Sequence, residues 1–536
     1  MKLVSDRLVP HEGPKDAELF FIGDAPSTSE DSMQRQMQGK HGEMFDIALS
    51  SIGLTREEVR IGNLLNYQPA KNDLRKAHTT WQFEQGCKEL KSYLATCKHK
   101  VLIPMGNRAL DFLMGFDGLE KHRGSVYKYK NMYVVPTIHP SLVTFQASNG
   151  PAFLKDIEKA LHIAENGWNE PKFNFIVDPD VYQLEGLLQT LLAAPRLYVD
   201  IETKKYTSYI RCIGFAWSDR DAVCIFNDGN YESNPIGPNF RRVISQLLES
   251  NIPKTFHNGM FDTIMLEENG FTVNGWDYDT MVAQHVLQPE LPIGLDYCTS
   301  MYTNINYYKD DGKESSDRID RTKLGIYNCK DVVATAQVQA AQQAEFDETS
   351  LRYFKYKMQQ VPLAKHFSKT GMLADEERRI ELKTTVADKL DRDYMVFIGI
   401  QNMYQTEPFK VSQHARVNDF LYEKLGLPVK TTSEGRVTSG EDSIVSLLSF
   451  TEKKIQDLKT EAGRQPWQVK LAALKLILRI RGYEKLLSSY IDVETSPDGR
   501  VRSWYKFWGT ETGRWSAGSW YDGTGLNGQT IPRESV

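Results

Sequence analysis

The sequence predicts an α/β protein of several domains whose C-terminal third is mainly helical. The chain has 536 residues, of which 40% are hydrophobic, and this is enough for several separate cores. Up to Asp331, short apolar runs alternate with amphipathic stretches, which favours strands and helices in α/β layers. Beyond it, long charged segments with helical periodicity follow, at 351–367, 375–401 and 467–490.

The first 165 residues contain four short apolar runs, at 19–22, 59–65, 101–105 and 132–136. Because helical patterns separate them, we expect a parallel sheet in an α/β sandwich. Functional side chains of such a sheet lie in the loops where its strands end. The polar segment that follows carries Gly167 and Pro171, which is typical of a linker.

Composition excludes several classes of protein. The formal net charge is −5, so any nucleic-acid binding must come from local patches and not from bulk attraction. No apolar run at the N-terminus or elsewhere is typical of a signal peptide or a membrane span. The six cysteines lack C-x-x-C spacing, which favours reduced thiols. We therefore expect a soluble, cytoplasmic protein without a membrane partner.

Acidic residues at domain-scale spacing form the main candidate site. Asp200 and Glu202 close the apolar run 197–203, and residues i and i+2 of a strand point to the same side. Asp262 and Asp331 follow. Carboxylates that face one another repel unless a cation lies between them, and oxygen ligands suit Mg²⁺. Two such ions can activate a water and stabilise the leaving oxygen of a phosphodiester. The alternative is that these acids are ordinary solvated surface groups.

Tyr327 lies four residues before Asp331, so the two share a face of a predicted helix. The patterns Asp200-x-Glu202, Asn258-x-x-x-Asp262 and Tyr327-x-x-x-Asp331 resemble the motifs of the DEDDy proofreading 3′–5′ exonucleases. The resemblance implies two divalent ions, Mg²⁺ or Mn²⁺, with Tyr327 orienting the nucleophile. It also implies that Asn258 and Phe261 shape the site and contact the terminal nucleotide. The metal ligands would be Asp200, Glu202, Asp262 and Asp331.

The N-terminal domain resembles the uracil-DNA glycosylase superfamily through its motifs at 23–26, 42–46, 61–63, 104–109 and 139–141. The resemblance implies a pocket for a flipped base. Asp24 stands where the family usually has glutamate, and no cysteine precedes Cys87, so we expect no iron–sulfur cluster. Base excision and binding of DNA or a partner without excision both remain open. The implied pocket consists of Asp24, Phe45 as the stacking ring, Asn63 as the base reader and His139 on the loop that enters the duplex.

The C-terminal third resembles family A DNA polymerases. Segment 425–431 is similar to their thumb, and 509–516 and 527–533 are similar to their T-x-T-G-R-x-S and N-L-Q-N-I-P signatures. A guanidinium such as that of Arg514 suits the primer–template backbone or minor groove. The resemblance implies DNA contacts by Thr512, Arg514, Asn527 and Gln529.

The order of these resemblances predicts five segments: a glycosylase-like domain at 1–165, a linker at 166–175, an RNase H-like exonuclease domain at 176–345, the lead-in to a family A polymerase with its thumb at 346–500, and the start of a palm at 501–536. The palm's metal-binding aspartates do not appear. We expect polymerisation to need palm and fingers from a second chain, unless the gene is interrupted or the chain shortened.

Such a fusion resembles the N-terminal portion of a replicative family A DNA polymerase of a large bacteriophage of the Bacillus lytic type, located in the host cytoplasm. Its partners would be primer–template DNA and single-stranded 3′ ends. Two alternatives are a non-catalytic DNA-binding or replisome scaffold, and a stand-alone repair enzyme that excises a base and trims the 3′ end.

Overall fold

The computed structural model describes residues 4–230, 232–233, 235–312, 320–432 and 435–531. The chain divides into two compact units. The first comprises Met1–Leu363 with Phe507–Arg514, and the second comprises Ala364–Lys506 with Trp515–Val536. The division falls inside the segment predicted as polymerase lead-in and thumb, and again inside the segment predicted as the start of a palm, because Phe507–Arg514 belongs to the first unit. The finer domain boundaries stay predictions.

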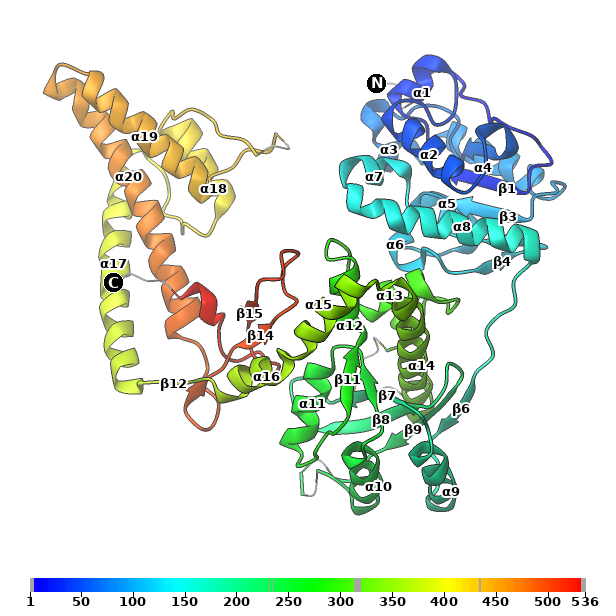
Figure 1. The fold of residues 1–536 in the computed structure, drawn as a ribbon. Coiled ribbons are helices and arrows are strands. Elements are labelled where there is room, and N and C mark those ends of the chain that lie inside the picture. Colours follow the sequence, from blue (N-terminus) through cyan, green and yellow to red (C-terminus); the bar gives the residue numbers. More distant parts are fainter. Residues whose placement is uncertain (1–3, 231, 234, 313–319, 433–434, 532–536) are drawn as a thin grey trace. The chain divides into compact units, whose positions relative to one another are not determined.

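The first unit begins with a five-stranded sheet in the order β2-β1-β3-β5-β4 (Figure 1). All pairs are parallel except β4 with β5. The predicted parallel α/β sheet is therefore confirmed. The strands are β1 (Leu19–Gly23), β2 (Arg60–Asn63), β3 (Val101–Pro104), β4 (Tyr127–Tyr129) and β5 (Met132–Val134).

Both faces of this sheet are covered, because successive side chains of a strand point to opposite sides. Phe21 lies in a core with residues of α2 (Lys40–Ser51) and α8 (Gly150–Asn166). Phe20 lies in a second core with residues of α4 (Trp81–Tyr93) and α5 (Asn107–Met114). Apolar strands that are buried on both sides are expected of a parallel sheet.

A six-stranded sheet follows, in the order β11-β10-β7-β8-β9-β6. The central strand β7 pairs antiparallel with β8 and parallel with β10. Helix α14 (Arg321–Glu345) packs along β7, β8 and β9, and α11 (Gly259–Glu268) packs beside β7 (Figure 1). The strands are β6 (Asn174–Val177), β7 (Leu197–Thr203), β8 (Ile210–Ala216), β9 (Asp221–Phe226), β10 (Lys254–Phe256) and β11 (Trp276–Asp279).

Buried polar contacts join the two sheet-bearing parts within the first unit. The Arg123 guanidinium donates to both oxygens of Asp156 and to Ser300 Oγ, which lies on α13 (Leu295–Tyr302). Lys159 Nζ donates to the carbonyl oxygens of Gly124 and Thr303. Arg123 and Asp156 are almost fully buried, so removal of either charge would leave the other unpaired in the interior.

The second unit is mainly helical, as predicted. Its core joins α17 (Glu376–Met403), α18 (His414–Asp419), α19 (Glu441–Asp457) and α20 (Glu461–Leu486). Two short antiparallel pairs accompany them: β12 (Met372–Leu373) with β13 (Arg500–Val501), and β14 (Trp504–Lys506) with β15 (Ser516–Gly518).

The prediction of one continuous helical stretch over 351–367 is wrong, because the structure has two helices there, α15 (Glu348–Met358) and α16 (Val361–Thr370). Pro362 lacks an amide hydrogen, which is tolerated in the first turn of a helix but not in its interior. None of the helices in the described ranges is long and apolar enough to cross a membrane.

Candidate metal centre

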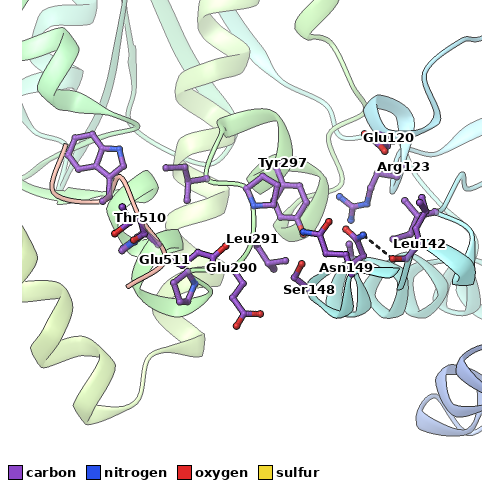
Figure 2. A pocket seen from close by; sticks show the side chains of 18 of the residues that line it. Glu120, Arg123, Leu142, Ser148, Asn149, Glu290, Leu291, Tyr297, Thr510 and Glu511 are labelled. Carbon is purple, nitrogen blue, oxygen red and sulfur yellow. Dashed lines mark hydrogen bonds between the residues drawn. The ribbon is translucent and has the colours of Figure 1, made fainter. Parts of the chain in front are cut away.

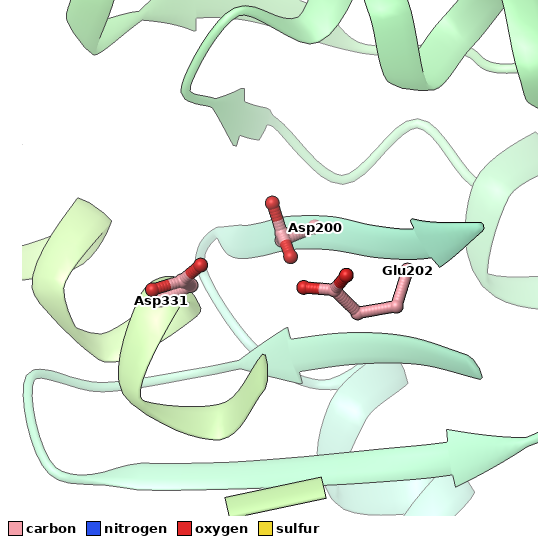
Figure 3. Close-up of side chains that lie close together, drawn as sticks. All are labelled: Asp200, Glu202 and Asp331. Carbon is pink, nitrogen blue, oxygen red and sulfur yellow. The ribbon is translucent and has the colours of Figure 1, made fainter. Parts of the chain in front are cut away.

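Three carboxylates from two elements meet beside the central strand. On β7, Leu197, Val199 and Ile201 are buried, whereas Asp200 and Glu202 alternate with them on the other side. Asp331 projects from α14, and one ligand oxygen of each acid lies within 4.8 Å of the others. Figure 3 shows the three carboxylates directed toward one shared space. The structure thus brings together three of the four predicted metal ligands.

Asp262, the fourth predicted ligand, lies next to this cluster on α11. Its Oδ1 accepts a hydrogen bond from the backbone amide of Ile201 at 3.0 Å, and its side chain is buried. The turn before α11 is fixed by Asp279, whose carboxylate accepts from the amides of Asn258 and Gly259. Asp262 is therefore tied to β7 at the residue between the two other acids.

Burial and mutual repulsion disfavour the charged forms of these acids. Burial, followed by the charges of Asp331 and Asp262, raises the pKa of Asp200 well above its usual value. Burial and the charge of Asp331 raise the pKa of Glu202 to about 7. Burial also raises the pKa of Asp262. Because a divalent cation would relieve this repulsion, an all-oxygen donor set of this kind fits Mg²⁺ or Mn²⁺.

Asn328 connects α14 to β7 directly. Its Nδ2 donates to Asp200 Oδ2 at 2.7 Å, so α14 holds one oxygen of this carboxylate in place. The approach needs Gly214 on β8, because a Cβ there would come within 2.4 Å of Asn328 Oδ1. Sequence reasoning missed Asn328, although it stands next to Tyr327 in the third motif.

A lysine lies at the Asp331 side of the cluster. Lys309 Nζ donates to Asp331 Oδ1 at 2.6 Å, to Oδ2 at 2.7 Å and to the Tyr327 hydroxyl at 3.2 Å. Tyr308 also donates to Asp331 Oδ1, at 2.5 Å. Burial alone would lower the pKa of Lys309, but the Asp331 carboxylate raises it above its usual value. Sequence reasoning missed Lys309 and Tyr308, because no motif marks their loop.

The residues predicted to contact a terminal nucleotide lie at the start of α11. Asn258 precedes the helix with a left-handed backbone, φ 63°, and Phe261 lies in its first turn. Both are partly exposed, and Asp262 follows Phe261 directly. The structure therefore places them on the turn and first helical turn that carry Asp262, and their role stays a prediction.

Three of the four predicted pocket residues of the first sheet lie at one edge of it, after β1, at the end of β2 and after β5: Asp24, Asn63 and His139. Asp24 accepts from the backbone amides of Arg108 and Ala109 at the start of α5. His139 caps α7 (Pro140–Phe145), and burial followed by the charge of His41 lowers its pKa to about 4.

The contacts of Phe45 and Asn63 differ from those expected of an open base pocket. Phe45, the fourth predicted residue, is fully buried with its ring edge-on to Phe21, at 4.9 Å between centroids. Asn63 Nδ2 donates to Gln36 Oε1 at 2.6 Å, and Gln36 is itself fully buried. The amide predicted to read a base is thus engaged by a side chain of the same domain.

The four polymerase-signature residues fall in different units. Thr512 and Arg514 are exposed on the segment Phe507–Arg514 of the first unit. The buried ammonium of Lys357 holds this segment by donating to the carbonyl oxygens of Phe507 and Gly513. Asn527 and Gln529 belong to the second unit, at a short helical turn, Gly528–Thr530. The last two residues of that signature lie outside the described ranges.

A pocket of about 530 Å³ lies elsewhere in the first unit. Its walls include Arg123 and Asn149, then Leu291 and Tyr297, and finally Thr510 (Figure 2). None of the acidic cluster lines it, so the pocket and the candidate metal centre are separate features.

Residues 10–162 match the model of the uracil-DNA glycosylase superfamily. The type-4 uracil-DNA glycosylase of Thermotoga maritima is 30% identical over 161 residues, which cover 81% of that enzyme and 28% of this chain. Through this domain, the chain belongs to the uracil-DNA glycosylase superfamily. Asp24, Asn63 and His139 are therefore residues of a superfamily domain.

Residues 177–347 match a 3′–5′ exonuclease family, and they contain the whole acidic cluster. DNA polymerase I of Chloroflexus aurantiacus is 23% identical over 371 residues, 63% of this chain. The chain spans 36% of the length of that relative. This member of the glycosylase superfamily is thus also family A DNA polymerase-like, with a 3′–5′ exonuclease domain.

The structure of the POL domain of Pol1 from M. smegmatis, in complex with DNA primer-template and dNTP, aligns with a TM-score of 0.49 at 18% identity. The alignment covers 68% of this chain and 56% of that one.

Proposed function

We propose that the acidic cluster hydrolyses 3′-terminal nucleotides of single-stranded DNA, as the proofreading exonuclease of a replicative, phage-type family A DNA polymerase. The observation that carries the proposal is the convergence of Asp200, Glu202 and Asp331 within 4.8 Å. A closely spaced group of mutually repelling carboxylates, of which Asp331 is buried, is the donor set that a hard divalent ion takes. The match of the surrounding residues to a 3′–5′ exonuclease family supports the same chemistry.

The three converging acids, with Asp262 beside them, would hold two Mg²⁺ or Mn²⁺ ions. Bound ions of this kind activate a water and stabilise the charge of a phosphodiester that is cleaved. Tyr327 contributes a phenol that accepts a hydrogen bond from Lys309. The phenol keeps its own proton, so it can donate to an oxygen of the water or of the phosphate and orient it.

Contacts to DNA would come from three further places. Asn258 and Phe261, next to Asp262, offer an amide and a ring to the terminal nucleotide. Arg514 and Thr512 are exposed on a segment held by buried Lys357, and a guanidinium there suits phosphate oxygens. Asn527 and Gln529 would contact primer–template DNA from the second unit.

For the glycosylase-like domain we propose binding of DNA or of a protein partner without base excision. Two observations favour this reading over catalysis. The Asn63 amide donates to buried Gln36, and the Phe45 ring is fully enclosed in the core. A flipped base would have to displace both arrangements before it could be stacked and read.

The test is hydrolysis of a 5′-labelled single-stranded oligonucleotide by the full chain with Mg²⁺. We expect a ladder of products shortened from the 3′ end, which chelator abolishes. Asp200→Ala should remove the ladder, whereas Asp277→Ala, which changes an exposed acid paired with Arg196, should not. Full hydrolysis by Asp200→Ala would refute the site. No hydrolysis by the native chain would favour a DNA-binding scaffold instead.

A further inference from the structure

The carboxylate of Asp331 is almost completely engaged by side chains of its own domain. An ionised carboxylate has about four lone-pair positions for donors or metal ions. Tyr308 takes one at Oδ1, and Lys309 takes one at each oxygen. Only one position, at Oδ2, is left. In this arrangement Asp331 can bind an ion through one oxygen at most.

Lys309 is held in this place from several sides. Its ammonium lies 5.2 Å from the ring centre of Tyr308 and 4.9 Å from that of Tyr327, so both rings face the cation. Gly312, three residues on, packs so closely on Tyr327 that a Cβ there would lie 2.7 Å from its ring. The side chain of Lys309 is only 18% exposed. These contacts distinguish it from a mobile surface lysine.

The ammonium binds the acid that completes the group of three carboxylates. Asp331 is the acid that α14 contributes to the cluster, and the charges of Asp200 and Glu202 face it from β7. A single positive charge here offsets part of their repulsion, but it offers less charge than a divalent ion. Lys309 and an ion at Asp331 therefore compete for the same oxygen atoms.

We propose that Lys309 is a built-in cation of the exonuclease site, which holds Asp331 and Tyr327 in place and must leave Asp331 before that acid can join Asp200 and Glu202 around a divalent ion. The proposal rests on the function proposed above, and it adds a positioning residue to that site. It predicts that Lys309 weakens ion binding by the three acids.

The test is binding of Mn²⁺ to the full chain without DNA, measured by the electron paramagnetic resonance signal of the free ion. Lys309→Met should tighten Mn²⁺ binding by the three acids at least about tenfold, because like charges about 4 Å apart repel strongly even at an effective dielectric constant near 20. Lys309→Arg keeps the charge, so its affinity for Mn²⁺ should stay within about twofold of native, given the same Coulomb term.

Lys330→Met is a matched control for loss of a nearby charge. Lys330 lies on α14 next to Asp331, but its ammonium pairs with Asp311, at 3.4 Å, and not with the cluster. We expect native Mn²⁺ binding for this variant. Should Lys309→Met fold poorly, Lys309→Gln removes the same charge and retains a polar group for Asp331. Thermal unfolding of each variant with and without Mn²⁺ gives a second measure of binding.

The outcomes separate the two proposals. Unchanged or weaker Mn²⁺ binding in Lys309→Met or Lys309→Gln, with native DNA hydrolysis intact, would overturn the role of Lys309 alone. Tighter Mn²⁺ binding in these variants, in a chain that never hydrolyses DNA, would support the role of Lys309 and refute the exonuclease. Absence of Mn²⁺ binding in both the native chain and Lys309→Met would overturn both.

Discussion

Glu202→Gln should stabilise the metal-free protein at alkaline pH, although it removes a residue of the proposed site. Burial and the charge of Asp331 raise the pKa of Glu202 from 4.5 to about 7 in the folded chain. The folded state therefore binds a proton more tightly than the unfolded state. The stabilisation that this tighter proton binding gives the folded state is fully present below pH 4.5 and is lost as the pH rises through 7. A shift of 2.5 pH units is worth about 3 kcal/mol.

Glutamine is neutral throughout this pH range, so the variant avoids this loss of folding stability. In chelator at pH 8 we expect the free energy of opening of β7 and α14 to be about 3 kcal/mol higher in Glu202→Gln than in the native chain. At pH 5 the difference should be less than about 1 kcal/mol. Hydrogen exchange with mass spectrometry measures this directly, as amide exchange roughly a hundredfold slower at pH 8. Glu249→Gln, an exposed change on α10 (Pro238–Glu249), should exchange like native.

The reasoning would be refuted if Glu202→Gln were no better protected than native at pH 8 in chelator. It would equally be refuted if the gain were the same at pH 5, because the effect must follow the ionisation of Glu202. Excess Mg²⁺ should reverse the ranking, since the native chain gains binding energy that the variant loses.

Other predictions follow from the same contacts. Tyr327→Phe should lower kcat for 3′ hydrolysis about a hundredfold with little change in KM, as measured on single-stranded DNA. Arg514→Ala should weaken binding to primer–template DNA and reduce the slope of log affinity against log salt by about one, as measured by fluorescence anisotropy. Asp156→Ala should cost the first unit about 3–5 kcal/mol, seen in denaturant unfolding, because Arg123 is left buried and unpaired. The full chain should leave uracil in single-stranded DNA, with no alkali-labile sites even at enzyme excess, because Gln36 engages the base-reading amide.

Much of the site follows from local periodicity. The alternation in a strand is enough to place Asp200 and Glu202 on one side of β7, and helical spacing places Tyr327 and Asp331 on one face of α14. The parallel sheet of the first domain was predictable for the same reason, because its strands are short apolar runs separated by amphipathic helices.

The rest depends on contacts between distant segments. Lys309 reaches Asp331 from the start of a short 3-10 helix (Lys309–Gly312), 22 residues earlier in the chain, and nothing in its local sequence marks it. Gln36 meets Asn63 across 27 residues in the same way. Lys357 binds the carbonyl oxygen of Phe507, 150 residues later in the chain, within the first unit. Because a distant contact assigns Phe507–Arg514 to this unit, local composition does not reveal the unit boundary. Such pairings are set by tertiary packing and not by periodicity.

The central claim is that Asp200, Glu202 and Asp331 form a divalent-metal site. Crystals of the chain soaked in Mn²⁺ would test it most directly, through anomalous difference density collected at the manganese absorption edge. We predict a strong peak between the three carboxylates, which is lost in Asp200→Ala. A map with manganese peaks elsewhere on the chain and none among these three acids would contradict the account.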